Sequence, residues 1–220
     1  MKIGLVCGNY PPFLGGVEIH AQQVAEEISA RHEVVVAAMN FAASRLPRSL
    51  GVLHANLLAP SAPDRMDGPV AVHSLSPTFA DRLVMLPLAL RATPRLQGWF
   101  YHEIRRLTHP FYAAAVIPRI RKLLLGCDVI HGLVQGDICW TALRVAHSLG
   151  IPFVCTPFVH PQQWGDGPDD VVHYRRSDAV IGLVETDRDY LRSLGISKEK
   201  LHVVGGFARP AGIHQRTRIS

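Results

Sequence analysis

The first thirty residues contain a pattern that few folds accommodate: a short apolar run, a loop rich in glycine and proline, and an amphipathic helix. Residues 1–7 (MKIGLVC) predict a buried strand, and residues 8–16 (GNYPPFLGG) predict a loop. Residues 17–30 repeat apolar side chains at the 3.6-residue spacing of one helix face. This order opens a doubly wound α/β domain, in which the helix N-terminus lies at the sheet edge and favours anions.

The loop ends in a glycine pair, Gly15 and Gly16. Neither residue has a Cβ, so a ligand can approach their backbone N–H groups closely. The same pair is equally compatible with a tight loop that only connects two elements. Taken alone, these residues leave both interpretations open.

Strand and helix patterns then alternate along the chain. Further strands are predicted at 33–39, 70–75, 128–133, 151–156, 179–184 and 201–205, with 52–58 as a candidate for a short extra one. Helices are predicted at 136–149, 169–176 and 185–194, and over 78–125 with breaks near Pro87, Pro94, Pro110 and Pro118. Alternation of this kind gives parallel pairing with right-handed crossovers. We therefore predict an α/β fold: a doubly wound, mostly parallel, Rossmann-like sheet of about seven strands with helices on both faces.

Charge is unevenly distributed. The chain carries 23 basic and 18 acidic residues, a formal net charge of +5, and is 48% hydrophobic, enough for one large core. Residues 91–122 hold seven basic side chains and the single acid Glu103, which accounts for the whole net charge. This segment predicts either a surface that lies against anionic lipid or, more commonly, a solvated helix face. The composition as a whole does not indicate nucleic-acid binding.

The cysteines indicate a reducing compartment. All four, at positions 7, 127, 139 and 155, lie outside any C-x-x-C pair, and the histidines show no ligand spacing, so we expect neither disulfides nor a metal. The longest apolar run, residues 83–92, is interrupted by Pro87 and Arg91 and is too short to cross a bilayer. We expect a cytoplasmic protein, and contact of residues 91–122 with the inner face of the membrane is the alternative to a solvated helix face.

Four stretches, in order, resemble the N-terminal half of retaining glycosyltransferases of the GT-B fold, the family 4 or group 1 type that includes sucrose synthases and bacterial mannosyltransferases. They are VCGNYPPFLGGVEIH at 6–20, CDVIHG at 127–132, IPFVCTPFVHPQQW at 151–164 and SDAVIGLVETDRDYLRSLGISKEKLHVVG at 177–205. Each motif is weak by itself, and four in register are fairly specific. Val184 departs from the pattern, where the family has Ser or Thr.

In that family, two α/β domains face each other across a cleft, with the acceptor held by the first and most of the nucleotide-sugar held by the second. The chain resembles only the first. We therefore expect residues 1–206 to form the acceptor-binding domain and residues 207–220 an irregular tail. The donor-binding domain, with its paired glutamates, is expected to be absent from this chain.

The resemblance also suggests where substrates bind. Gly15 and Gly16 would face the diphosphate of the donor, and His160 would be the catalytic candidate. The family's corresponding histidine contacts the transferred sugar or the acceptor hydroxyl, and a histidine near neutral pKa can donate or accept a proton there. A loop histidine packed beside Pro161 is the alternative for His160.

Four more residues are candidates for substrate binding. Glu18 and His20 lie in the first turn of the first predicted helix, and His131 lies near the end of a predicted strand. Glu185 begins the helix that follows the strand at 179–184. A solvated helix start is the alternative for Glu18 and His20. A packed strand end is the alternative for His131, and a helix cap is the alternative for Glu185.

The resemblance implies transfer of a hexosyl group from a nucleotide-sugar to a hydroxyl of a glycan or lipid-linked acceptor, in carbohydrate biosynthesis. No cofactor is expected, and transfer needs a donor-binding half, for which a separate polypeptide and a continuation of the same coding frame are the two alternatives. A stand-alone or truncated, non-catalytic domain that binds a sugar or a partner is the alternative. An NAD(P)-dependent dehydrogenase is less favoured, because residues 8–16 lack G-x-G-x-x-G and the second predicted strand ends at Met39-Asn40 without an acid for the ribose.

Overall fold

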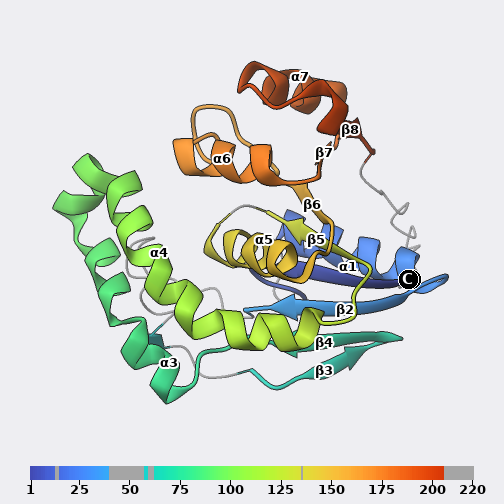
Figure 1. The fold of residues 1–220 in the computed structure, drawn as a ribbon, viewed down its shortest axis with the longest axis horizontal. Helices are drawn as coiled ribbons and strands as arrows, with labels where there is room; N and C mark the ends of the chain where they lie inside the picture. Colours follow the sequence, from blue (N-terminus) through green and yellow to red (C-terminus); the bar gives the residue numbers. More distant parts are fainter. Residues whose placement is uncertain (13–14, 40–56, 59–61, 135, 206–220) are drawn as a thin grey trace, which may run out of the picture.

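A computed structural model describes residues 1–12, 15–39, 57–58, 62–134 and 136–205, except for the side chains of 94–99. Eight strands form one sheet in the order β3-β4-β2-β1-β5-β6-β7-β8 (Figure 1). Their bounds are β1 Lys2–Cys7, β2 Glu33–Ala38, β3 Arg65–Asp67, β4 Val70–Ser74, β5 Val129–Leu133, β6 Phe153–Thr156, β7 Ala179–Gly182 and β8 Leu201–Val203. Every pair is parallel except β3 with β4.

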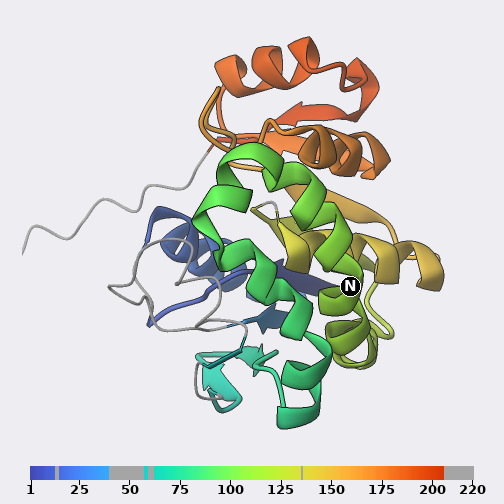
Figure 2. The same ribbon diagram turned by 90° about the vertical axis from the view of Figure 1, so that its left-hand side faces the viewer.

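Helices cover both faces of the sheet. They are α1 Gly16–Ser29, α3 Phe79–Val84, α4 Pro94–Leu124, α5 Asp137–Leu149, α6 Pro168–Arg176 and α7 Glu185–Ser193, with 3-10 turns η2 Leu86–Ala92 and η3 Lys198–Lys200. The apolar stripe of α1 packs on one face, while α4, α5 and α6 pack on the other. Figure 2 separates α1 (blue) from α5 (yellow) on opposite sides of the sheet.

The structure confirms the predicted fold class and changes its details. The sheet has eight strands rather than seven, because the three-residue strand β3 pairs antiparallel at the edge. The candidate strand at 52–58 lies outside the described residues except for Leu57 and Leu58, which belong to a π-helical turn. No described helix is both long and apolar enough for a bilayer crossing.

The expected breaks at Pro110 and Pro118 are wrong, because both prolines lie inside α4. Each proline removes one backbone donor, but burial of side chains from the same helix, such as Tyr112 and Ile120, offsets that loss. The single backbone departure within α4 is at Phe100, with φ −134° and ψ 33°, where the helix changes direction.

The winding of the chain reverses at β1. From this central strand the chain proceeds to β2 and β4 on one side, whereas β5, β6, β7 and β8 follow on the other. The carboxyl ends of β1 and β5 are neighbours, with Cys7 paired to Leu133. Connections that leave these ends diverge, which creates the crevice where open α/β sheets bind ligands. Beside it Val134 has φ +80°, a rare conformation for a β-branched residue.

Salt bridges tie η2 and α4 to the beginnings of α5 and α6. The buried Arg91 guanidinium donates to both carboxylate oxygens of Asp137, at 2.5 and 3.2 Å, and His109 Nδ1 lies 2.9 Å from the same carboxylate. Arg105 lies 4.0 Å over the Trp140 ring and 3.6 Å from an Asp170 oxygen. These contacts hold the middle of α4 beside the carboxyl edge of the sheet.

Two further basic residues of the 91–122 segment are also paired, Arg106 with Asp169 and Arg119 with Asp81. Four of its seven basic side chains therefore face carboxylates from other parts of the chain. The segment is a tethered layer of the fold rather than a uniformly basic surface.

We predict that Asp137→Ala lowers the free energy of unfolding by about 3 kcal/mol, because it removes the carboxylate that balances the charge of the buried Arg91 guanidinium. Urea denaturation monitored by circular dichroism measures this loss. Asp189→Ala, which removes an exposed partner of Arg188, is the control and should cost less than about 0.5 kcal/mol. Equal effects of the two substitutions would contradict a tethering role for Asp137.

Candidate functional site

A groove with a volume of about 620 Å³ opens at the carboxyl edge of the sheet, between the start of α1 and the loop after β6. The helix contributes Gly16, Val17, Ile19, His20 and Gln23, the loop contributes Phe158, His160 and Trp164, and Leu183 follows β7. Two segments about 140 residues apart in the sequence therefore form its walls. The groove lies where the sheet topology places a ligand site.

The glycine pair forms the beginning of α1. Gly15 is the N-cap residue, with extended backbone and no side-chain cap among the described residues, and Gly16 is the first helical residue. A Cβ added to Gly16 would meet no atom within 4 Å, so this residue presents bare backbone to open space. The uncapped N–H groups of the first turn can bind an anion there.

Glu18 occupies the space beside the other glycine. A Cβ on Gly15 would collide with the Glu18 carboxylate, which folds back over the N-cap. Glu18 does not line the groove. Its negative charge compensates the positive end of the helix in the absence of a ligand.

His20 and His131 approach each other from α1 and β5. His20 is half-buried, with its ring edge-on to Phe158 at 5.2 Å between centroids, and burial lowers its pKa. His131 Nε2 lies 2.8 Å from Thr156 Oγ1. Burial and the neighbouring His20 lower the pKa of His131 to about 4. At neutral pH His131 is therefore an uncharged ring beside His20.

His160 is exposed, and its position is fixed by the loop around it. Its backbone forms a bridge with Trp164, and the two rings lie 4.1 Å apart between centroids. Asp166 ties the loop down by accepting hydrogen bonds from the Gln162 backbone N–H at 2.6 Å and from the Tyr190 hydroxyl at 2.7 Å. The imidazole therefore lines the groove on a braced loop.

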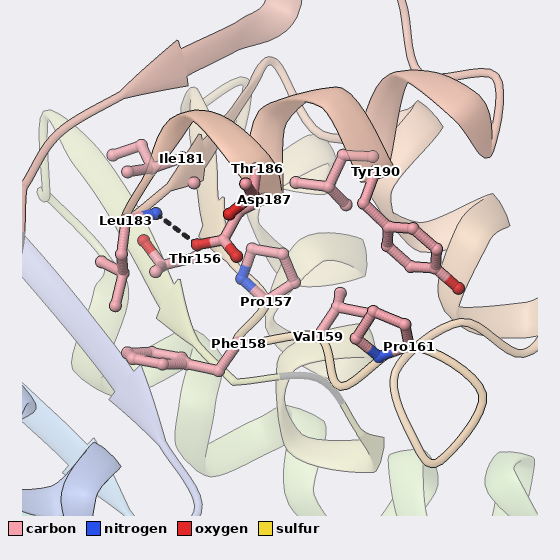
Figure 3. Close-up of a pocket in the computed structure, with 12 residues that line it drawn as sticks. Thr156, Pro157, Phe158, Val159, Pro161, Ile181, Leu183, Thr186, Asp187 and Tyr190 are labelled. Atoms are coloured by element: carbon pink, nitrogen blue, oxygen red, sulfur yellow. Dashed lines mark hydrogen bonds between the residues drawn. The ribbon is translucent and has the colours of Figure 1, made fainter.

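A second pocket of about 210 Å³ adjoins the groove and shares Phe158 and Leu183 with it. Figure 3 shows Thr186 and Asp187 extending from α7 toward Thr156 and Pro157. Asp187 caps α7, because its Oδ2 accepts hydrogen bonds from the backbone N–H of the N-cap residue Val184 at 3.2 Å and from that of Leu183 at 2.9 Å. The pocket extends the groove toward the N-terminus of α7.

The structure brings together three of the sequence-predicted residues, since Gly16, His20 and His160 line one groove. Gly15 adjoins it. His131 lines neither concave region, but it neighbours His20 of the groove, and its partner Thr156 lines the adjoining pocket. Glu185 lines neither pocket, and its largely exposed carboxylate pairs with Arg188 at 2.5 Å.

Sequence reasoning missed Phe158, Trp164 and Asp187 as components of the site. The first two flank His160 within the resembling stretch 151–164, which was the available signal. The sequence does not reveal that Phe158 has a positive φ of +49°, because this conformation depends on how the loop packs. Across the described residues, no cluster of three or more histidines, cysteines or carboxylates has the arrangement of a metal site.

Comparisons with known proteins agree with the family resemblance found in the sequence. A family model described as "Glycosyl transferase 4-like domain" matches residues 15–206. No curated protein sequence matches the chain significantly.

Three similar solved structures can be compared with the chain. HepE of Anabaena, in complex with UDP-glucose, is 12% identical with a TM-score of 0.54, over 94% of this chain and 44% of that one. The lipopolysaccharide outer core galactosyltransferase WaaB is 11% identical with a TM-score of 0.55, over 93% and 45%. UDP-GlcNAc 2-epimerase of Methanocaldococcus jannaschii is 15% identical with a TM-score of 0.52, over 94% and 46%. The chain spans less than half of each, and the likeness is one of fold.

We predict that the free energy of unfolding falls on acidification, because the pKa of His131 is lower in the folded chain than in the unfolded chain. Between pH 4 and 6.5 the unfolded chain binds a proton at His131 that the folded chain does not, so stability rises with pH across this window. His131→Gln keeps a partner for Thr156 and removes the titration, so the slope should become shallower. Urea midpoints at pH 4.5, 5.5 and 7 measure the slope, and His202→Gln on an exposed position is the control. An unchanged slope in His131→Gln would contradict the assignment.

Proposed function

The chain belongs to the glycosyl transferase 4-like domain family, and on this basis we propose that it is the N-terminal, acceptor-side domain of a GT-B glycosyltransferase. The observation that carries the proposal is the groove at the carboxyl edge, where the bare backbone of Gly16 lies opposite His160. The reaction is transfer of a hexosyl group from a nucleotide-sugar to an acceptor hydroxyl, with retention at the anomeric carbon.

The beginning of α1 is suited to the leaving group. Glycosyl transfer breaks the bond between the anomeric carbon and the diphosphate oxygen, and negative charge develops on the departing diphosphate. Backbone N–H groups at Gly15 and Gly16 and the positive end of α1 would stabilise that charge without a metal. The Glu18 carboxylate, which lies over the N-cap, would have to move aside as the diphosphate arrives.

The histidines are suited to the sugar and the acceptor. His160, exposed on its braced loop, would accept a hydrogen bond from the acceptor hydroxyl or hold the transferred sugar. His20 forms the α1 side of the same groove, and neutral His131 lies next to it. The adjoining pocket, with Thr186 and Asp187, offers polar groups for more of the acceptor.

The donor base and the sugar are assigned to a second α/β half of the fold, because residues 15–206 match only the glycosyl transferase 4-like domain. Structures that share the fold include complexes with UDP and UDP-glucose, so UDP-sugars are the first donors to test. The acceptor would be a glycan or a lipid-linked sugar. For the lipid-linked case, Arg121 and Lys122 are exposed basic residues at the end of α4 that form no salt bridge with a described carboxylate, and they would face an anionic membrane on the cytoplasmic side.

We predict that Gly16→Val weakens binding of UDP-glucose to the 220-residue chain at least about tenfold, because its side chain enters the space reserved for the diphosphate. Saturation-transfer NMR with UDP-glucose and UDP measures the effect. Ala30→Val, at the opposite end of the same helix, is the matched control and should bind as the parent does. Equal affinity of Gly16→Val and the parent would remove the loop from the site.

We predict that His160→Ala lowers turnover by about 10²–10⁴-fold in the enzyme assembled with its donor half, while the melting temperature changes little, since His160 is exposed. Product formation from UDP-glucose is the activity measurement, and His202→Ala is the control. Proportional loss of turnover and stability would mean that His160 only packs the loop. Binding without turnover in the assembled protein would favour a non-catalytic sugar-binding domain.

A further inference from the structure

A separate pocket lies on the outer surface where α4, α5 and α6 meet, and it shares no residue with the groove or with the pocket beside it. Its volume is about 190 Å³. The walls are largely apolar, with Pro110 from α4, Trp140 and Leu143 from α5, and Val172 from α6. Val172 is 49% exposed, which leaves an apolar surface facing solvent at this point.

Basic side chains surround this apolar surface. Arg106, Arg144 and Arg176 all line the pocket, together with one carboxylate, Asp169. Arg106 pairs with Asp169 at 2.7 Å, while Arg144 and Arg176 form no salt bridge with any other residue that the structure describes. The rim therefore has a net positive charge and is complementary to an anion.

A buried imidazole lies at the inner end. His173 is only 3% exposed, and neither of its ring nitrogens has a hydrogen-bond partner within the described chain. Burial, together with the positive charge of Arg105, lowers the pKa of His173 to about 3, so the ring is neutral. A buried polar group left unpaired costs about 1–3 kcal/mol, and a ligand oxygen that accepts from its N–H would recover much of that.

We propose that this pocket binds an amphipathic anion, with an aromatic or short acyl body against Trp140, Leu143 and Val172 and a carboxylate or phosphate head among the arginines. The volume equals that of roughly six water molecules, which fits one ring or a short chain and excludes a nucleotide-sugar. The ligand is thus distinct from the donor. It is either a free metabolite-sized molecule or the corresponding part of an anionic lipid.

Titration of the 220-residue chain with phenyl phosphate, followed by NMR, tests the proposal. Phenyl phosphate should bind at least tenfold more tightly than either inorganic phosphate or benzyl alcohol, because each of these has only one half of the required chemistry. Affinity for phenyl phosphate no greater than for inorganic phosphate would overturn the proposal.

Variants locate the site. Arg144→Glu combined with Arg176→Glu, and separately Val172→Asp, should each weaken phenyl phosphate binding at least tenfold, whereas Arg192→Glu on exposed α7 should not. His173→Phe should fold at least as stably as the parent and still bind less tightly, which a purely structural histidine would not produce. Unchanged affinity in all three pocket variants would overturn the assignment.

Vesicles identify the source of the ligand. If the parent chain sediments with phosphatidylglycerol vesicles and Arg144→Glu/Arg176→Glu does not, the pocket receives a lipid. If phenyl phosphate binds but vesicles do not, the ligand is a free small anion. Either result supports the site. If the chain binds neither phenyl phosphate nor the vesicles, the site is excluded.

Discussion

The reversal of winding at β1 is the constraint on which the rest of the molecule depends. Right-handed crossovers send the chain to opposite sides of this strand, so α1 covers one face while α5 and α6 cover the other. The connections after β1 and β5 must then diverge at the carboxyl edge. The groove between Gly16 and His160 is a direct result, because α1 and the loop after β6 form its two walls.

Salt bridges fix the position of the helical layer that lies beside the carboxyl edge of the sheet. Helix N-termini disfavour cations, yet Arg91 and Arg105 lie at the beginnings of α5 and α6. The carboxylates of Asp137 and Asp170 compensate them there. Buried pairs of this kind add little net stability, but removal of one partner is costly, so they specify where η2 and α4 dock. The same pairing explains why seven basic residues in one segment do not form one basic surface.

The two concave regions differ in chemistry. The groove at the sheet edge offers bare backbone at a helix N-terminus and histidines on its walls, which suits a phosphate-bearing sugar. The pocket on the helical layer offers an apolar floor, two arginines that pair with no described carboxylate and a buried imidazole, which suits a smaller amphipathic anion. Because they share no residue, a substitution in one leaves the lining of the other unchanged, and each can be tested separately.

Local sequence determined the strand and helix pattern, because periodicity and glycine stops are local signals, and it placed Gly16, His20 and His160 near strand ends that a parallel sheet gathers at one edge. Tertiary structure alone decided what depends on partners distant in sequence. The strand β3 forms only against β4, Pro110 lies within a helix only because α4 is packed, and Arg91 finds Asp137 46 residues away. Such contacts have no local period in the sequence, since the energy that selects them comes from the assembled fold.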